Sequence, residues 1–246
     1  MAGLKELMRF FLFSLKRKES KSHYVEFQAY QAELIIKELR SRGVHIKNKR
    51  ILELGCGRGG YSLKFARETK KLVATDLTKP SYALKANPKI KFVKLDASRH
   101  FPFKGESFDL VICFSLIEHV KNPRPMLNEI FRVLKDKGTL ILTFPPFWSP
   151  LGGHRYKPFH LLGEKLAIKI HNTFLRGYKK VKSYETTYGS WGLYPLKIKD
   201  VSSLLLASNF KIQDKWVRFS PLNFAKIPIF NEFLTWHVCF LCKKRK

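Results

Sequence analysis

The feature that most limits the fold of this chain is an apolar run that passes directly into a cluster of glycines. Residues 51–60 read Ile-Leu-Glu-Leu-Gly-Cys-Gly-Arg-Gly-Gly, which predicts a strand, a tight turn and the start of a helix. Glycine permits the backbone conformations that such a turn needs, and it lets a ligand approach the main chain closely. The segment therefore predicts a nucleotide-binding α/β domain.

The central part of the chain alternates between two kinds of element. Apolar runs predict strands over residues 50–54, 72–75, 91–95, 109–114 and 139–144. Helices are predicted over 60–67 and 123–134, and a further helix over 24–42 ends at Gly43. Strands that alternate with helices form a parallel sheet with right-handed crossovers, so we expect such a sheet here.

The C-terminal part has a different pattern. A helix is predicted over 201–208, followed by strands over 210–217 and 234–242. Because no long helix separates these two strands, they are predicted to form an antiparallel pair that extends the sheet. We predict one domain over 23–246, with a cofactor-binding half at 50–145, a substrate loop and insertion at about 145–200, and the terminal strand pair at 209–242.

Three carboxylates at successive strand ends distinguish between two classes of ligand. The glycine spacing also satisfies the dinucleotide pattern, so the turn by itself leaves both classes open. Glu53 lies within the strand before the turn, where a carboxylate suits a cationic group and repels a pyrophosphate. Asp76 ends the next strand and can accept hydrogen bonds from ribose hydroxyls, and Asp96 ends the third and can accept one from an adenine amino group. Together they favour an adenosine that carries an amino acid.

The segment Glu53-x-Gly55-x-Gly57-x-Gly59 resembles motif I of the class I S-adenosylmethionine-dependent methyltransferases, and residues 101–120 resemble the motif that follows it. The resemblance covers roughly residues 50–145 and is to the broad group that includes ubiquinone and menaquinone C-methyltransferases. It implies a Rossmann-like α/β fold with a mainly parallel seven-stranded sheet, a reversed last strand and helices on both faces. It also implies S-adenosyl-L-methionine as the cofactor, whereas the acceptor stays open because the group is broad.

The resemblance further implies where each part of the cofactor lies. The methionine part would follow the glycine turn, the ribose the end of the second strand, the adenine the end of the third, and the sulfonium the end of the fourth. The residues implied are Gly55, Gly57 and Gly59 with Glu53 and Cys56 beside them, then Asp76 and Leu77, Asp96 and Ala97, and Phe114 and Ser115.

Residues 145–160 follow the fifth predicted strand and are rich in proline, glycine and aromatic residues. We expect this loop at the carboxyl ends of the strands, where ligands bind in this fold class. Methyl transfer is an in-line displacement, and a general base is needed only if the acceptor must lose a proton. The candidate catalytic residues are His154, His160 and His119, and the candidate substrate residues are Phe147, Trp148, Arg155, Tyr156 and Lys157. An ordinary polar loop, and a structural or cofactor-pocket role for His119, stay open.

The chain is strongly basic, with 47 Lys and Arg against 19 Asp and Glu and a net charge of +28. Such a field favours anionic partners such as nucleic acid, acidic lipid headgroups or phosphorylated substrates, while a plain solubility bias is the alternative. Residues 1–22 are predicted as an amphipathic helix with the basic run Lys16-Arg17-Lys18. This helix either lies on an anionic membrane or covers the domain's own core.

No apolar run reaches the ~18 residues of a membrane span, and we recognise no secretory signal, so a cytoplasmic location, with peripheral membrane contact as a further option, is expected. Cys239 and Cys242 form a CxxC within a predicted strand. Because residues at this spacing point to opposite faces of a strand, a structural role is predicted and no metal site is expected.

The leading interpretation is a methyltransferase for a small-molecule or lipid-linked acceptor that could be anionic. A first alternative is an RNA methyltransferase that uses the positive charge, although we recognise no RNA-binding module. A second is a non-catalytic binding protein on the same scaffold, which the intact glycines and the pair Asp76 and Asp96 disfavour.

Overall fold

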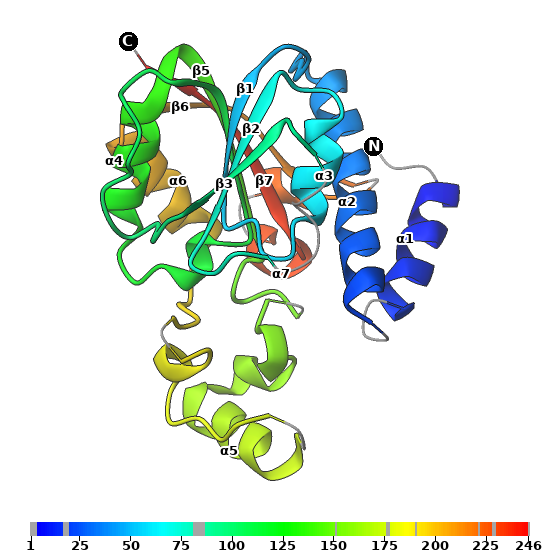
Figure 1. The fold of residues 1–246 in the computed structure, drawn as a ribbon. Coiled ribbons are helices and arrows are strands. Elements are labelled where there is room, and N and C mark those ends of the chain that lie inside the picture. The colour runs from blue at the N-terminus through cyan, green and yellow to red at the C-terminus, as the bar shows by residue number, and fades with distance from the viewer. Residues whose placement is uncertain are drawn as a thin grey trace.

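A computed structural model describes residues 4–16, 20–80, 87–150, 152–175, 178–189, 191–220, 222–227 and 230–245 (Figure 1). Its centre is a seven-stranded sheet in the order β3-β2-β1-β4-β5-β7-β6. The strands are β1 (Arg50–Leu54), β2 (Lys71–Asp76), β3 (Ile90–Lys94), β4 (Phe108–Phe114), β5 (Leu134–Phe144), β6 (Phe210–Val217) and β7 (Val238–Lys244). Neighbours among β1 to β5 are parallel, and β7 is antiparallel to both β5 and β6. The predicted mainly parallel sheet with a reversed last strand is confirmed.

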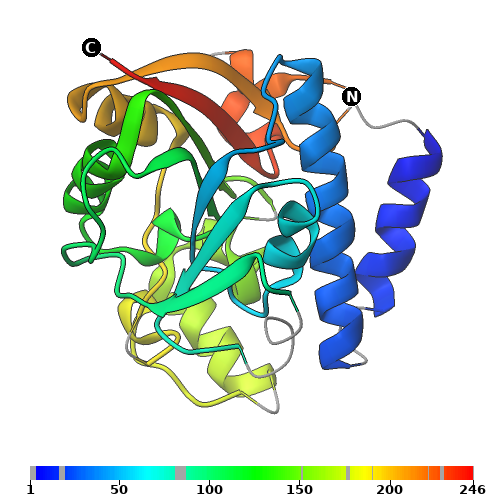
Figure 2. The same cartoon turned by 45° about the horizontal axis from the view of Figure 1, so that its top comes forward.

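Helices cover both faces of this sheet. The α-helices of the described residues are α1 (Leu4–Lys16), α2 (Lys21–Ser41), α3 (Gly60–Ala66), α4 (Pro123–Val133), α5 (Glu164–Phe174), α6 (Ile198–Ala207) and α7 (Asn231–Leu234). Of these, α5 lies in a lobe away from the sheet (Figure 1). Helices α2 and α3 lie on one face, and α4 and α6 lie on the other (Figure 2). The helix α2 begins at Lys21, three residues before the predicted start at residue 24, because the Ser20 hydroxyl accepts the backbone N–H of His23 at 3.0 Å and caps the helix there. It is followed by Gly43 at a φ of 74°, which confirms the predicted helix end.

Alternate residues of the central strands divide the core into two apolar clusters, one on each face. Within β7, Cys239 packs in the cluster under α2, whereas Cys242 packs in the cluster under α4 and α6. The two thiols therefore lie on opposite faces of the sheet, as their spacing predicted. The strand itself begins at Val238 and not at residue 234, because Asn231–Leu234 form a short helical turn with Leu234 exposed.

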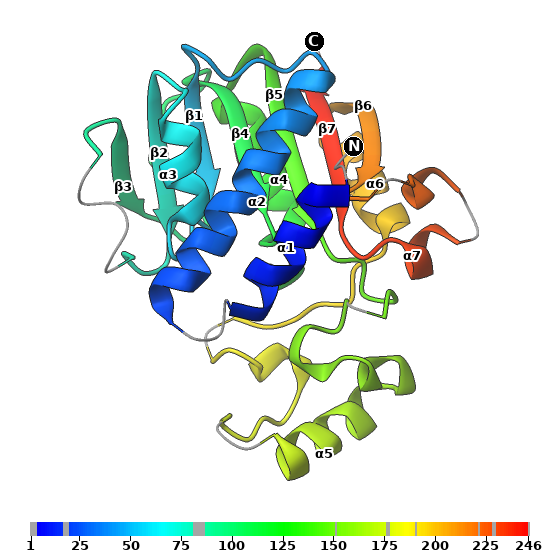
Figure 3. The ribbon, with the colours of Figure 1, turned by 90° about the vertical axis from the view of Figure 1, so that its right-hand side faces the viewer.

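The N-terminal helix α1 lies on the outer side of α2 (Figure 3). The ring of Phe10 packs 5.4 Å from that of Phe27 and 5.2 Å from that of Phe219, so this side of α1 covers the core of its own domain. The opposite side exposes Met8, Phe11, Leu12 and Leu15. The predicted basic residues Arg17 and Lys18 lie outside the described residues. Within the described ranges, no helix is both long and apolar enough to cross a membrane.

Between β5 and α6 the chain leaves the sheet and forms a separate lobe that carries α5 (Figure 1). We call residues 147–196 the insertion, because the N–H of Phe147 donates to the carbonyl of Leu196 at 3.0 Å and joins its two ends. The insertion has a small apolar cluster of its own, made of Phe147, Tyr156, Ala167, Ile168, Val181, Tyr184 and Leu193. It is therefore packed independently of the two clusters that hold the sheet.

Candidate active site

The glycine turn joins β1 to α3 and has the backbone that its sequence predicts. Gly55, Gly57 and Gly59 have φ values of 70°, 54° and 85°, in the left-handed region that a residue with a Cβ adopts at a cost. A Cβ on Gly55 would also lie only 3.1 Å from Cδ1 of Leu116. The turn therefore needs glycine both for its conformation and for its close packing against the segment after β4.

The turn is tied to the end of β2 by hydrogen bonds. The N–H of Cys56 donates to the carbonyl of Thr75 at 2.9 Å, and the N–H of Gly57 donates to Oδ2 of Asp76 at 2.8 Å. The other carboxylate oxygen of Asp76 accepts the N–H of Thr78 at 3.3 Å. Each oxygen keeps further lone-pair capacity, so the half-buried carboxylate can still accept hydrogen bonds from a diol. Leu77 lies beside it and is exposed.

Glu53 is buried within β1, and its carboxylate accepts a hydrogen bond from the hydroxyl of Ser62. Burial raises the pKa of Glu53 to about 7, the Ser62 hydrogen bond opposes this, and the nearby charge of Asp76 adds to it. A group that titrates near neutral pH can ionise in response to a cation placed beside it. Glu53 is therefore suited to meet a cationic group of a ligand.

Asp96 lies just past β3 and is partly exposed. It accepts the N–H of Ser98 at 2.9 Å and the hydroxyl of the same residue at 2.6 Å, and it pairs with Arg99 at 3.3 Å. Burial acts to raise the pKa of Asp96, but the hydrogen bonds from Ser98 and the charge of Arg99 lower it overall. The carboxylate is therefore ionised at neutral pH and remains an acceptor. Ala97 beside it packs against the core.

Phe114 and Ser115 stand at the carboxyl end of β4. The ring of Phe114 is buried 4.9 Å from that of Tyr61, so its side chain packs beneath α3. Ser115 has a φ of 52°, and its hydroxyl lies 2.9 Å from Nε2 of His237. Burial keeps the pKa of His237 well below its usual value, with the charge of Arg218 acting in the same direction, so this imidazole is neutral.

The residues predicted in the loop after β5 separate into two groups. Phe147, Tyr156 and His160 are buried in the insertion. Nε2 of His160 lies 3.0 Å from the carbonyl of Ser149, and a Cβ on Gly153 would lie 2.1 Å from its ring. Burial lowers the pKa of His160. These three side chains pack the insertion from within.

The second group is more accessible. Trp148 is half-buried and stacks edge-on to Phe147, and Lys157 is exposed. The guanidinium of Arg155 lies 4.4 Å from the ring centre of Tyr188, which fixes a cation beside the insertion's aromatic residues. Of the predicted acceptor-binding residues, Arg155 is therefore held in place by a defined contact.

His154 and His119 are brought together, and a third residue joins them. Glu118 is only 2% exposed, and His154 directs Nε2 to within 3.6 Å of its Oε1. The ring centres of His119 and His154 are 5.0 Å apart. We call Glu118, His119 and His154 the Glu118 cluster. Burial lowers the pKa of His119, and the charge of Glu118 opposes this.

The insertion supplies the frame of this cluster. Nδ1 of His119 lies 2.7 Å from the carbonyl of Gly192, and the His119 ring packs edge-on against Trp191 and Tyr188. The N–H of Tyr194 donates to the carbonyl of Glu118 at 2.8 Å. The cluster is therefore assembled where the end of β4 meets the insertion, a few residues beyond Ser115.

The sequence reasoning assigned no role to Glu118, Tyr188, Trp191 or His237. Glu118 belongs to the segment that resembles the methyltransferase motif, and it directly precedes the candidate residue His119. Its position just after a predicted strand could have marked it as a further candidate. No comparable local pattern marks the other three. They reach the site only through contacts between residues far apart in the chain.

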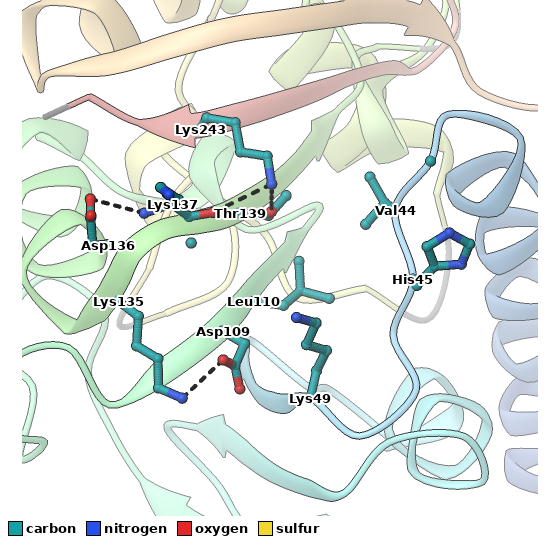
Figure 4. A pocket seen from close by; sticks show the side chains of 12 residues that line it. Val44, His45, Lys49, Asp109, Leu110, Lys135, Asp136, Lys137, Thr139 and Lys243 are labelled. Carbon is teal, nitrogen blue, oxygen red and sulfur yellow. Dashed lines mark hydrogen bonds and ion pairs between the residues drawn. The ribbon is translucent and has the colours of Figure 1, made fainter.

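A separate hollow of about 270 Å³ lies at the opposite end of the sheet, where β1, β4 and β5 begin (Figure 4). Four lysines line it, but Lys135 is paired with Asp109 at 2.9 Å and Lys243 donates to the Thr139 hydroxyl at 2.6 Å. Two of the four lysines therefore already have partners within the hollow. It is remote from the strand ends that carry the glycine turn and the Glu118 cluster.

The segment that holds the glycine turn and most of the first five strands is similar to a known protein family. A family model described as a methyltransferase domain matches residues 52–142. A ubiquinone biosynthesis O-methyltransferase of Aliivibrio fischeri is 25% identical over 174 residues, which cover 63% of this chain and 72% of that protein. An uncharacterised protein of Methanocaldococcus jannaschii is 36% identical over 142 residues, which cover 56% of this chain and 60% of that protein.

Solved structures share the fold. An S-adenosylmethionine-dependent methyltransferase from Mesorhizobium loti superposes with a TM-score of 0.59 at 15% identity, covering 92% of this chain and 100% of the other. A 1,6-didemethyltoxoflavin N1-methyltransferase from Burkholderia thailandensis, solved with its substrate and S-adenosylhomocysteine, superposes with a TM-score of 0.58 at 14% identity, covering 100% of this chain and 92% of the other. The likeness extends beyond the matched family region to the insertion and the terminal strand pair.

Proposed function

Since the chain is a class I S-adenosylmethionine-dependent methyltransferase, we propose that it methylates an ionisable group, such as a hydroxyl, on a small-molecule or lipid-linked acceptor. The observation that carries this proposal is the Glu118 cluster, which holds a carboxylate and two imidazoles beyond the carboxyl end of β4. Groups of this kind take up or stabilise the proton that a hydroxyl loses.

The residues of the cofactor side fit S-adenosylmethionine. The glycine turn leaves Gly57 exposed and open to a ligand, and Asp76 and Asp96 keep acceptor capacity for the ribose and the adenine. Glu53, which lies in β1 just before the turn, can ionise to meet the ammonium group. When bound, the cofactor supplies an electrophilic methyl group on a sulfonium sulfur.

The chain's own contribution to the reaction is position and proton transfer. An in-line displacement gains most from holding the acceptor collinear with the reacting methyl group. The insertion is placed to do this, because the frame of Tyr188 and Trp191 fixes His119 beside the end of β4. Glu118 or His154 then receives the acceptor proton, and Arg155 attracts an acceptor that carries negative charge.

The name of a relative supports oxygen as the methylated atom. The similar Aliivibrio fischeri protein is named as an O-methyltransferase of ubiquinone biosynthesis. A hydroxyl attached to an aromatic ring is acidic enough to be deprotonated by a carboxylate or an imidazole in a buried site. We therefore propose a hydroxylated aromatic compound as the first class of acceptor to test.

The exposed side of α1 supports a lipid-linked acceptor. Met8, Phe11, Leu12 and Leu15 form an apolar surface on a chain with a net charge of +28. An apolar helix face on a cationic protein suits an anionic membrane, where apolar side chains enter the interface and basic residues meet the headgroups. Peripheral binding of this kind would bring the enzyme to an acceptor that carries a lipid tail.

The proposal is tested by calorimetry with S-adenosylmethionine, followed by transfer of a labelled methyl group to hydroxylated aromatic compounds, lipid fractions, sugar phosphates and RNA. We expect cofactor binding and label in a hydroxylated small molecule or lipid. Label in RNA alone would overturn the proposal in favour of an RNA methyltransferase. Cofactor binding without transfer to any fraction would favour the non-catalytic alternative.

A further inference from the structure

Glu118 has an unusual environment for a carboxylate. It is 2% exposed, and neither of its side-chain oxygens accepts a hydrogen bond from any residue that the structure describes. The nearest cationic candidate, Nε2 of His154, is 3.6 Å away, which is too long for a hydrogen bond, and this nitrogen also lacks a partner among the described residues. Burial of a carboxylate without hydrogen-bond partners is strongly unfavourable unless another charge compensates it.

Each of the two imidazoles has its Nδ1 near a polar atom. Nδ1 of His119 lies 2.7 Å from the Gly192 carbonyl, and a carbonyl only accepts, so Nδ1 carries the proton and Nε2 the lone pair. Nδ1 of His154 lies 3.5 Å from the hydroxyl of Tyr188, which leaves Nε2 directed at Glu118. A ligating histidine characteristically holds its second nitrogen against a carbonyl or another polar group in this way.

The spacing of the three side chains permits a shared ion. One ligand atom from each of Glu118, His119 and His154 lies within 4.8 Å of the other two. Around an ion held at about 2.0–2.2 Å, neighbouring ligand atoms are roughly 3.3 Å apart, so the three ligand atoms would move closer to one another by up to about 1.5 Å when the ion binds. No other group of three such residues in the described part of the chain meets the same spacing.

We propose that the Glu118 cluster is a binding site for a divalent transition ion of the zinc class, with Glu118, His119 and His154 as its ligands. Two imidazoles and one carboxylate are the ligand set that such ions prefer, and three protein ligands leave an open position. The ion supplies the positive charge that the buried carboxylate lacks. The site differs from the CxxC of β7, whose thiols lie on opposite faces of the sheet.

The position of the Glu118 cluster suggests what a bound ion would contribute to the reaction. An ion there would face the acceptor side of the enzyme, where it could hold an oxygen of the acceptor and favour its ionised form. That use depends on the proposed function, but ion binding does not. Without an ion, Glu118 or His154 would receive the acceptor proton directly; with the ion bound, the same side chains would act on that proton through the ion, so their removal lowers turnover in both cases.

The test uses the full chain, freed of metal with a chelator and titrated with Zn²⁺ by calorimetry and with Co²⁺ by visible absorption. We expect one equivalent to bind, and Glu118→Gln and His154→Ala each to weaken binding by at least 10–100-fold, the loss that follows even from removal of a residue supporting a ligand. His45→Ala is the matched control, because His45 is exposed and lies at the opposite end of the sheet. It should bind as the unchanged chain does.

A second measurement covers the case in which a variant folds poorly. Thermal unfolding should show that Zn²⁺ stabilises the unchanged chain and His45→Ala but not Glu118→Gln, and that without metal Glu118→Gln is at least as stable as the unchanged chain. Absence of stoichiometric binding, or equal affinity in all variants, would overturn the inference. Metal binding without methyl transfer would contradict only the proposed function, and methyl transfer without metal binding would contradict only the metal site.

Discussion

Two regions of this enzyme are built in different ways: the strand ends around the glycine turn, which we propose as the cofactor side, and the Glu118 cluster with the insertion, which we propose as the acceptor side. The cofactor side is shaped mainly by the backbone: glycines with positive φ form the turn, and a main-chain N–H of Gly57 binds Asp76 at the end of the neighbouring strand. The acceptor side depends on side chains from separate segments, where His119 after β4 meets His154 and Trp191 of the insertion. Cofactor affinity and acceptor chemistry should therefore be separable by mutation.

The largest effect should come from the acceptor side. Glu118→Gln and His154→Ala should each lower turnover by about 10²–10⁴-fold, because the group that takes up or stabilises the acceptor proton is lost. Cofactor affinity should barely change, since Asp76 and Asp96 lie in other segments. Labelled-methyl transfer on an identified acceptor and calorimetry with S-adenosylmethionine measure the two quantities on the same preparations.

His160→Ala is the matched variant for this experiment. It removes a histidine from the same segment, but one that packs beneath Gly153 inside the insertion. We expect a lower unfolding temperature and, at a temperature where the variant is folded, turnover close to that of the unchanged chain. Full turnover in both His154→Ala and His160→Ala would instead direct attention to His119, or to an acceptor that needs no base.

The next effect belongs to the cofactor side. Asp76→Ala should weaken S-adenosylmethionine binding by about 1.5–3 kcal/mol, because charged hydrogen bonds are lost and the N–H of Gly57 loses its partner. Calorimetry measures this, with Asp136→Ala at the opposite end of the sheet as the control. Unchanged affinity in Asp76→Ala, or a preference of the unchanged chain for NAD, would contradict the assignment of the turn.

A smaller effect should follow pH. Because the pKa of Glu53 is raised to about 7, this group is mostly protonated near pH 6 and mostly ionised near pH 8. An ammonium group binds the ionised form, so affinity for S-adenosylhomocysteine should rise about tenfold over this interval. Glu53→Gln keeps the shape of the side chain and should remove that part of the dependence. Parallel pH profiles of the two proteins would show that Glu53 does not meet the ammonium group.

The smallest effect concerns α1. Phe11 is 61% exposed, whereas Phe10 packs against the domain. Phe11→Ser should reduce binding to anionic vesicles roughly fivefold, equivalent to about 1 kcal/mol of partly buried apolar surface, without changing the unfolding temperature. Phe10→Ser should lower the unfolding temperature. Equal recovery of the unchanged chain and Phe11→Ser with sedimented vesicles would exclude this face as the contact.

The contrast between the two sides also explains what could be predicted from the sequence. The strands, the glycine turn and the positions of Asp76 and Asp96 follow from short-range patterns, because a strand end and a left-handed turn are properties of neighbouring residues. The fold confirmed these elements. The apolar run before β7 was assigned as strand from residue 234, but Phe233 and Leu234 are exposed, so their apolar character did not mark a buried strand.

The acceptor side could be predicted only in part. His119 and His154 were selected separately from their places after two strands, but nothing local indicated that they meet, or that the Glu118 carboxylate lies 3.6 Å from His154 with no hydrogen-bond partner among the described residues. Phe147 was selected as an apolar residue and Tyr156 as a polar residue of a pocket wall, but both side chains pack in the apolar cluster of the insertion. Sequence composition does not distinguish these uses, because the difference lies in which way the side chains face.

The single hydrogen bond between Phe147 and Leu196 gives the insertion a consequence for evolution. It brings both ends of the lobe together beside β5. The distance that the chain must span between its exit from the sheet and its return is therefore short, whatever the length of the lobe. A lobe with its own apolar cluster can then be lengthened, shortened or replaced without disturbing the strand register or the cofactor turn. If the insertion binds the acceptor as proposed, exchange of this lobe would change the acceptor while the glycine turn stays the same.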